Sequence, residues 1–89
     1  MSTKGRKQFL EAVAENRSII RYVKLFRMPL FLTVLDEEMK KTDDSVWQQE
    51  NSVRETAFNV MPITLQQFGI PQEEIYSVIE QCITEFGKK

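Results

Sequence analysis

Residues 71–89 read PQEEIYSVIEQCITEFGKK and carry the clearest helix signal in the sequence. Proline is favoured at the first position of a helix, and Glu73 and Glu74 place negative charge where the helix dipole is positive. Apolar side chains then recur every three or four residues, which is typical of one continuous helical stripe. The stripe comprises Ile75, Val78, Ile79, Cys82, Ile83 and Phe86. Since glycine commonly ends helices, we expect this helix to stop at Gly87.

A second helix is predicted over residues 46–61. Ser45 and Gln48 have the spacing of a capping box, which satisfies free amides at a helix start. Pro62 is expected to end the helix, because an interior proline removes a backbone hydrogen bond and clashes with the preceding turn. A single short helical turn should follow, and Gly69 is expected to close it.

The first third of the chain indicates a helix that begins at Gln8, after a flexible basic tail over residues 1–7. Asn16 is the one polar residue among the apolar positions of this helix. Either Asn16 makes a buried hydrogen bond, or the helix breaks there and Ser18 caps a second piece. Pro29 is suited to the first turn of another helix, which we expect over residues 30–41.

The whole pattern favours an all-α fold, a compact bundle of four to five short helices with connections of a few residues. A chain of 89 residues has room for one hydrophobic core, so residues 8–89 should form a single helical domain. Residues 19–35 leave an alternative open, because they are rich in β-branched and aromatic side chains. In that alternative the fold is α+β, with a small hairpin within residues 19–35.

The composition excludes many kinds of catalysis, since the chain has no histidine and one cysteine. Histidine-dependent nucleophile pairs, imidazole acid–base chemistry and histidine metal ligands are therefore absent. One cysteine can form neither an internal disulfide nor a CxxC zinc site, and Cys82 should be a buried structural thiol. Neighbouring carboxylates such as Glu37 and Glu38 diverge by about 100° on a helix, so the two groups cannot act together on one substrate. We expect no enzymatic activity, no metal and no cofactor.

The net charge of -1 conceals an asymmetry along the chain. Residues 1–27 carry seven basic and two acidic side chains, a net charge of +5, and residues 28–89 carry five basic and eleven acidic ones, a net charge of -6. Four of the cations form a basic stripe, which comprises Arg17, Arg21, Lys24 and Arg27. The stripe either meets Glu73, Glu80 and Glu85 of the last helix, in one molecule or in a dimer, or it faces another molecule.

The apolar content suggests an exposed patch. Six Phe, one Trp and four Met are many for 89 residues, and a domain of this size buries only about 60% of its unfolded surface. Trp47 adjoins the polar half of its predicted helix, and Phe31 lies in a run of consecutive apolar residues. We expect an exposed aromatic patch around Phe31 and Trp47 that lies in a protein interface.

These features predict a small non-enzymatic protein-binding module, of the regulator, adaptor or immunity and inhibitor type. Its partner would be another protein or a second copy in a homodimer, bound through the basic stripe and the aromatic patch. The alternative is a nucleic-acid-binding regulatory protein that uses the basic N-terminal helix as a dimer, although a net charge of -1 is unlike a dedicated nucleic-acid binder.

The sequence shows no targeting segment. Glu11 directly follows Phe9 and Leu10, so the uninterrupted apolar run of a secretory signal is missing. Arg21 and Lys24 interrupt the longest apolar region, which is far shorter than the ~20 apolar residues of a membrane span. We expect a cytoplasmic protein without a membrane span.

Overall fold

In the computed structural model, which describes residues 5–88, every regular element is helical. The elements in chain order are α1 (Arg6–Ala14), α2 (Arg17–Tyr22), the 3₁₀-helix η1 (Leu25–Arg27), α3 (Met28–Met39), the 3₁₀-helix η2 (Asp44–Gln48), α4 (Glu50–Gln67) and α5 (Gln72–Lys88). The predicted all-α bundle is confirmed. The alternative hairpin within residues 19–35 is wrong, because α2, η1 and α3 occupy that segment.

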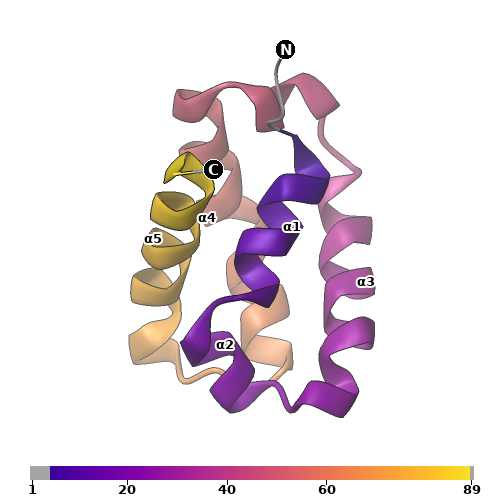
Figure 1. Cartoon of the computed structure of the whole chain (residues 1–89), viewed down its shortest axis with the longest axis vertical. Helices are drawn as coiled ribbons and strands as arrows, with labels where there is room; N and C mark the ends of the chain where they lie inside the picture. Colours follow the sequence, from indigo (N-terminus) through magenta and orange to yellow (C-terminus); the bar gives the residue numbers. More distant parts are fainter. Residues whose placement is uncertain (1–4, 89) are drawn as a thin grey trace.

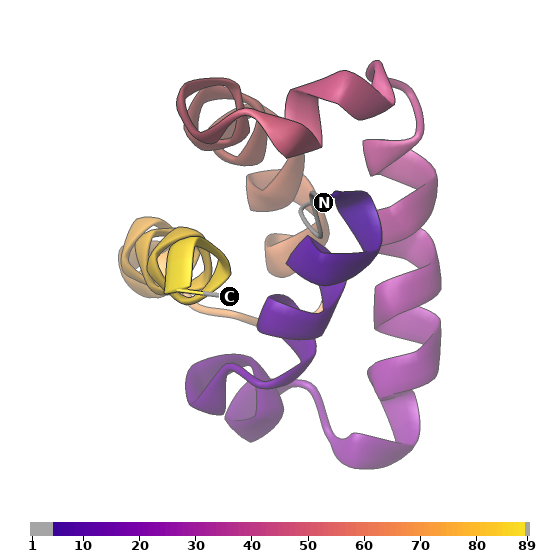
Figure 2. The ribbon, with the colours of Figure 1, turned by 45° about the horizontal axis from the view of Figure 1, so that its top comes forward.

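Helices α1, α3, α4 and α5 run along the length of the molecule, with α1 in front of α4 and flanked by α5 and α3 (Figure 1). Figure 2 shows the same arrangement, with α1 lying between α3 and α5. The 3₁₀-helix η2 covers one end of the bundle, where α1 begins and α5 ends. At the opposite end, α2 and η1 lie beside the end of α4 and the start of α5. This second end contains the candidate site described below.

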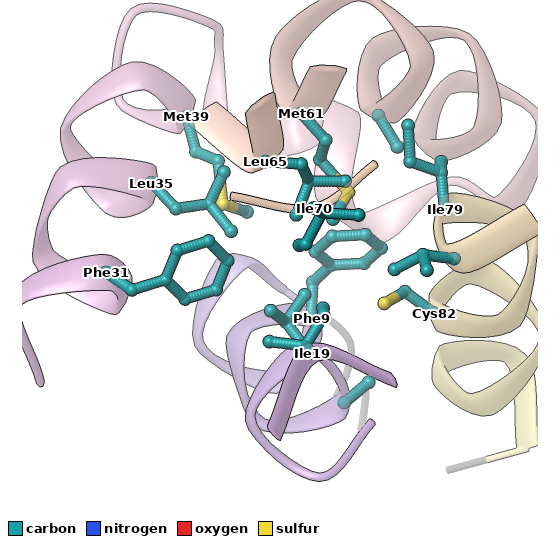
Figure 3. Packing of buried hydrophobic residues seen from close by; sticks show 14 of the residues in the cluster. Phe9, Ile19, Phe31, Leu35, Met39, Met61, Leu65, Ile70, Ile79 and Cys82 are labelled. Atoms are coloured by element: carbon teal, nitrogen blue, oxygen red, sulfur yellow. The ribbon is translucent and has the colours of Figure 1, made fainter. Parts of the chain in front are cut away.

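The core lies between the four longer helices. Figure 3 shows Phe9 of α1, Phe31 of α3, Leu65 of α4 and Ile79 of α5 pointing toward one another. The side chains with no exposed surface include Phe9, Val13, Ile19, Phe31, Leu35, Met39, Trp47, Val53, Met61, Leu65, Ile79 and Cys82. These come from α1, α2, α3, α4, α5 and η2, so the hydrophobic effect links all parts of the chain into one unit.

The break at Asn16 is confirmed, but the capping residue is Asn16 itself and not Ser18. Its Oδ1 accepts a hydrogen bond of 3.0 Å from the backbone N–H of Ile19, which satisfies a free amide at the start of α2. Helix α1 begins at Arg6, two residues before the expected start. The rest of the expected flexible tail, residues 1–4, lies outside the described residues.

Both predicted ends of the helix over residues 46–61 are wrong. Asp43 caps η2, since its Oδ1 accepts from the N–H of Ser45 at 3.1 Å, and α4 begins only after η2. Pro62 lies inside α4, which continues to Gln67. The reason is burial, because the last turns of α4 place Met61 and Leu65 in the core, and this gain outweighs the one lost hydrogen bond.

Glycine ends α4 but does not end α5. Gly69 has a φ of 94°, a left-handed conformation, and its N–H donates to the carbonyl of Gln66. Helix α5 runs through Gly87 to Lys88, so the predicted stop at Gly87 is one residue early. The apolar stripe of α5 is buried as expected, with Ile83 partly exposed at its edge.

Candidate binding surface

The expectation that Phe31 and Trp47 form an exposed patch is wrong. Both residues are completely buried. The ring of Phe31 lies 5.1 Å from that of Phe68, and the ring of Trp47 lies 5.0 Å from that of Phe9. Trp47 is enclosed because η2 folds across the end of the bundle, a placement that no local sequence pattern indicates.

The basic stripe of Arg17, Arg21, Lys24 and Arg27 is exposed, and none of the four makes an ion pair within residues 5–88. The acidic residues of α5 have other neighbours. Glu80 pairs with Arg54 of α4, and Glu85 lies 3.9 Å from Lys88. The internal pairing of the stripe with α5 therefore does not form among the described side chains. The four cations have no carboxylate partner there, and they lie at the end of the bundle that α2 and η1 occupy.

Three large apolar side chains lie exposed next to these cations. Leu25 is 73% exposed, Phe26 82% and Leu30 55%. They occupy η1 and the first turn of α3, where the chain turns from α2 into the bundle. We call this surface the α2–α3 corner, and it comprises Arg21, Lys24, Leu25, Phe26, Arg27 and Leu30.

Phe26 was missed because of where α2 ends. A continuous helix through residues 8–26 would place Phe26 on the buried side, together with Phe9 and Ile19. Instead α2 stops at Tyr22 and the backbone becomes extended at Val23, with a ψ of 101°. Extended backbone at Val23 turns the following residues away from the core, so Phe26 projects into solvent. The adjacent pair Leu25–Phe26 was no clear signal, because adjacent apolar residues such as Val78 and Ile79 are both buried in α5.

The corner is held to the bundle by contacts at both ends of α2. At its start, Asn16 Nδ2 donates to Gln81 Oε1 of α5 at 3.0 Å, and Ile19 is buried. At its end, the hydroxyl of Tyr22 donates to the carboxylate of Glu74. This hydrogen bond raises the pKa of Tyr22, because Glu74 stabilises the protonated phenol. These contacts place the corner in a defined position.

Arg27 connects the corner with the end of α4. Its guanidinium carbon lies 4.9 Å from the centre of the Phe68 ring, within the range of a cation–π contact. The guanidinium has no carboxylate partner among the described side chains. The positive charge beside Leu25 and Phe26 is therefore held in place and is not neutralised.

An open polar pocket lies between α5 and the turn from α1 to α2, where Gln81 is bonded to Asn16 and Glu80 is paired with Arg54. No group of three or more acidic, cysteine or histidine side chains within residues 5–88 could hold a metal ion. Within the same residues, no helix has the length and apolar character needed to cross a bilayer.

Cys82 is buried, as predicted. Its side chain faces the core from α5 (Figure 3), and loss of hydration raises the pKa of the thiol to about 12. The thiol is therefore protonated at neutral pH and is not a nucleophile.

Comparison with known proteins does not change this picture. No protein-family model, no curated protein and no solved structure matches the chain. The function is accordingly inferred from the geometry and charge of the α2–α3 corner.

Proposed function

We propose that this protein is a small, non-enzymatic binding module that recognises another protein through the α2–α3 corner. The observation that carries the proposal is the exposure of Leu25, Phe26 and Leu30 beside cations that have no carboxylate partner among the described side chains. A regulator, an adaptor and an immunity or inhibitor protein would all act in this way, by occupying a surface of the partner.

The arrangement resembles the energetic centre of a protein interface. Such centres contain aromatic and arginine side chains whose burial supplies most of the affinity. Phe26 is the most exposed large apolar side chain of the described residues, and Arg27 follows it directly. Burial of Phe26 would supply affinity, and the surrounding cations would steer an acidic partner and limit its orientation.

Nucleic-acid binding is the second candidate, and the unpaired basic stripe is the observation that favours it. Arg17 and Arg21 are one helical turn apart on α2 and could contact phosphates. Phosphate contacts would leave Leu25 and Leu30 exposed, so this function accounts for less of the corner. A steep fall of affinity with rising salt would distinguish it, because each phosphate contact releases counterions.

Co-purification from the native host tests the protein-binding proposal. The bait is the full chain, compared with Phe26→Ser and with Tyr76→Ser, a control whose aromatic side chain is 65% exposed on α5. We expect one protein to be retained in constant proportion by the wild type and by Tyr76→Ser, and to be lost with Phe26→Ser. Identical retention by all three baits would contradict the proposal, and loss of the retained material on nuclease treatment would support the second candidate.

A further inference from the structure

The apolar surface of the corner continues along the side of the bundle, between α3 and α4. On α3, Leu30 and Val34 are one turn apart, on the flank turned away from Asp36, whose Oδ1 lies 2.7 Å from Nε of Arg6 in α1. Figure 1 shows α3 beside both α1 and α4, with α1 in front of α4. Because Asp36 faces α1, the flank that carries Leu30 and Val34 borders α4. Leu30 is 55% exposed and Val34 is half-buried.

Helix α4 presents a matching flank. Phe58 marks its other side, because the Phe58 ring lies 5.7 Å from that of Tyr76 in α5. Val60 and Ile63 are turned away from Phe58 by more than a third of a helical turn, so they border α3. Ile63 is 66% exposed and Val60 is half-buried. We call the surface formed by Leu30, Val34, Val60 and Ile63 the α3–α4 seam.

The α3–α4 seam has little charge of its own. The α4 residues that share its flank are Thr56, Asn59 and Gln67, which are neutral. Its charged residues lie at the far end of α3, where Lys41 pairs with Glu38 at 3.0 Å. At the near end, the cations of the α2–α3 corner have no carboxylate partner among the described side chains, and Arg27 lies over Phe68.

We infer that the α3–α4 seam and the α2–α3 corner together bind an acidic amphipathic α-helix of the partner. The inference rests on the proposed function. An amphipathic helix binds by placing residues at i, i+3, i+4 and i+7 into an apolar groove between helices. Helix α3 has 12 residues and is ~18 Å long, which matches about three turns of a bound helix. Carboxylates at one end of that helix would pair with Lys24 and Arg27.

The geometry favours this occupant over a membrane, a nucleic acid or a second copy. A bilayer surface that contacts Phe26 of η1, at one end of the bundle, would not cover Ile63 of α4, because α4 runs along the length of the bundle. Phosphates would gain nothing from an uncharged seam. A second copy lacks a suitable helix, because α5, which carries four glutamates, has its apolar stripe in the core of its own bundle.

A displayed peptide library tests the inference with the full chain as the target. Each peptide has 18 residues with leucine or phenylalanine at i, i+3, i+4 and i+7, and with Glu, Lys, Gln or Ser at random on the polar face. We expect selection of peptides with glutamates at one end of the helix. Selected peptides should lose about thirtyfold in affinity with Phe26→Ser and about tenfold with Ile63→Ser.

Tyr76→Ser is the matched control for Ile63→Ser, because the side chains of Tyr76 and Ile63 are almost equally exposed, at 65% and 66%. Tyr76 belongs to α5 and lies beside Phe58, on the side of α4 away from Ile63. Tyr76→Ser should leave the affinity unchanged. In nitrogen–proton correlation spectra, added peptide should shift amides of residues 24–34 and 59–67. The same spectra without peptide show whether each variant is folded, so a loss of affinity by unfolding is recognised directly.

Several results would overturn the inference. Selection of basic or uncharged peptides, shifts confined to the side of Tyr76, or equal affinities of Ile63→Ser and wild type would each do so. Flotation with phosphatidylserine vesicles that depends on Phe26, without any peptide selection, would replace the helix by a membrane. If co-purification finds a Phe26-dependent protein and no peptide binds, the inference fails and the proposed function stands. If both experiments fail, the proposed function fails as well.

Discussion

Phe26 lies just before α3 and Phe31 lies in its first turns, and the two residues have opposite environments. Phe31 is completely buried and Phe26 is 82% exposed. The difference follows from backbone position, since Phe31 lies on the face of α3 that also carries Leu35 and Met39, whereas Phe26 lies in η1, before the helix starts. The core is complete without Phe26. An aromatic side chain that a complete core leaves outside is available for binding, which is why the corner and not the predicted patch is the candidate site.

The same contrast separates two parts of the basic N-terminal third. Arg6, at one end of the bundle, forms two ion pairs. Its Nε lies 2.7 Å from Asp36 Oδ1, and its Nη1 lies 3.4 Å from Asp44 Oδ1. Arg21 and Arg27, at the other end, contact aromatic rings and have no carboxylate partner within residues 5–88. The charge asymmetry of the sequence is therefore partly neutralised at one end and remains open at the corner.

The largest expected effect is the loss of stability when a buried aromatic residue is replaced. Phe31→Ala and Trp47→Ala should each lower the free energy of unfolding by about 3–5 kcal/mol, because each leaves a cavity in the core. Phe26→Ala should change it by less than about 0.5 kcal/mol, since the side chain is in solvent. Urea denaturation followed by circular dichroism measures all three. A cost at Phe26 close to that at Phe31 would show that the corner has a structural role.

Cys82 provides a chemical measure of how closed the core is. With a pKa of about 12 against 9.0 for a free thiol, the folded protein should react with iodoacetamide at pH 8 about a thousandfold more slowly than the urea-unfolded chain. The raised pKa also has a consequence for stability. Below pH 9 the thiol is protonated in both states and stability does not depend on it, whereas the stability of the folded state should fall as the pH rises from 9 toward 12, because the unfolded thiol ionises first. Rapid alkylation of the native protein would indicate that α5 leaves the core readily.

Asn16 links α2, which leads to the α2–α3 corner, with the core helix α5, because its side chain caps α2 and is hydrogen-bonded to Gln81 of α5. Asn16→Ala should lower the free energy of unfolding by about 1–2 kcal/mol through loss of the cap. Asn16→Asp is the matched control, because it keeps the oxygen that accepts from Ile19 and loses the amide that donates to Gln81. Thermal unfolding should rank the wild type above Asn16→Asp and Asn16→Asp above Asn16→Ala. Equal stability of Asn16→Ala and wild type would mean that α2 is not anchored at this residue.

A small effect on stability is expected at the cations of the corner. Replacing Arg21, Lys24 and Arg27 together by Gln should lower the free energy of unfolding by no more than about 1 kcal/mol, because the variant loses two exposed cation–π contacts and no ion pair among the described side chains. The same variant should bind an acidic partner with a lower association rate and a weaker dependence on salt. Stopped-flow association at two salt concentrations measures this. A strongly destabilised variant would show that these cations act within the fold.

Much of the fold was predictable from local signals. The apolar spacing of α5, the break at Asn16 and the turn at Gly69 all follow from a few neighbouring residues, and the structure contains each of them. The end of α4 was not predictable in this way. Pro62 is a local signal to stop, but Leu65 is buried by residues far away in the chain, and that burial decides the outcome.

The candidate site was only half predictable for the same reason. The cations of the basic stripe could be identified because charged residues without nearby opposite charges remain in water almost wherever the chain folds. Phe31 and Trp47 were misplaced, because an apolar side chain is equally suited to a core and to an interface. Only the packing of η2 and α3 against the other helices shows that these two rings are inside and that Leu25 and Phe26 are outside.

The amino-acid sequence by itself favoured the helical class and a single core and determined the separation of basic from acidic residues, because periodicity and charge are properties of the chain before it folds. The tertiary structure alone decided which apolar residues remain in contact with water. That choice depends on the total volume that four packed helices can enclose, and no short segment contains this information. Phe26 lies beyond that volume, beside Arg27, and this position makes the α2–α3 corner the surface to test.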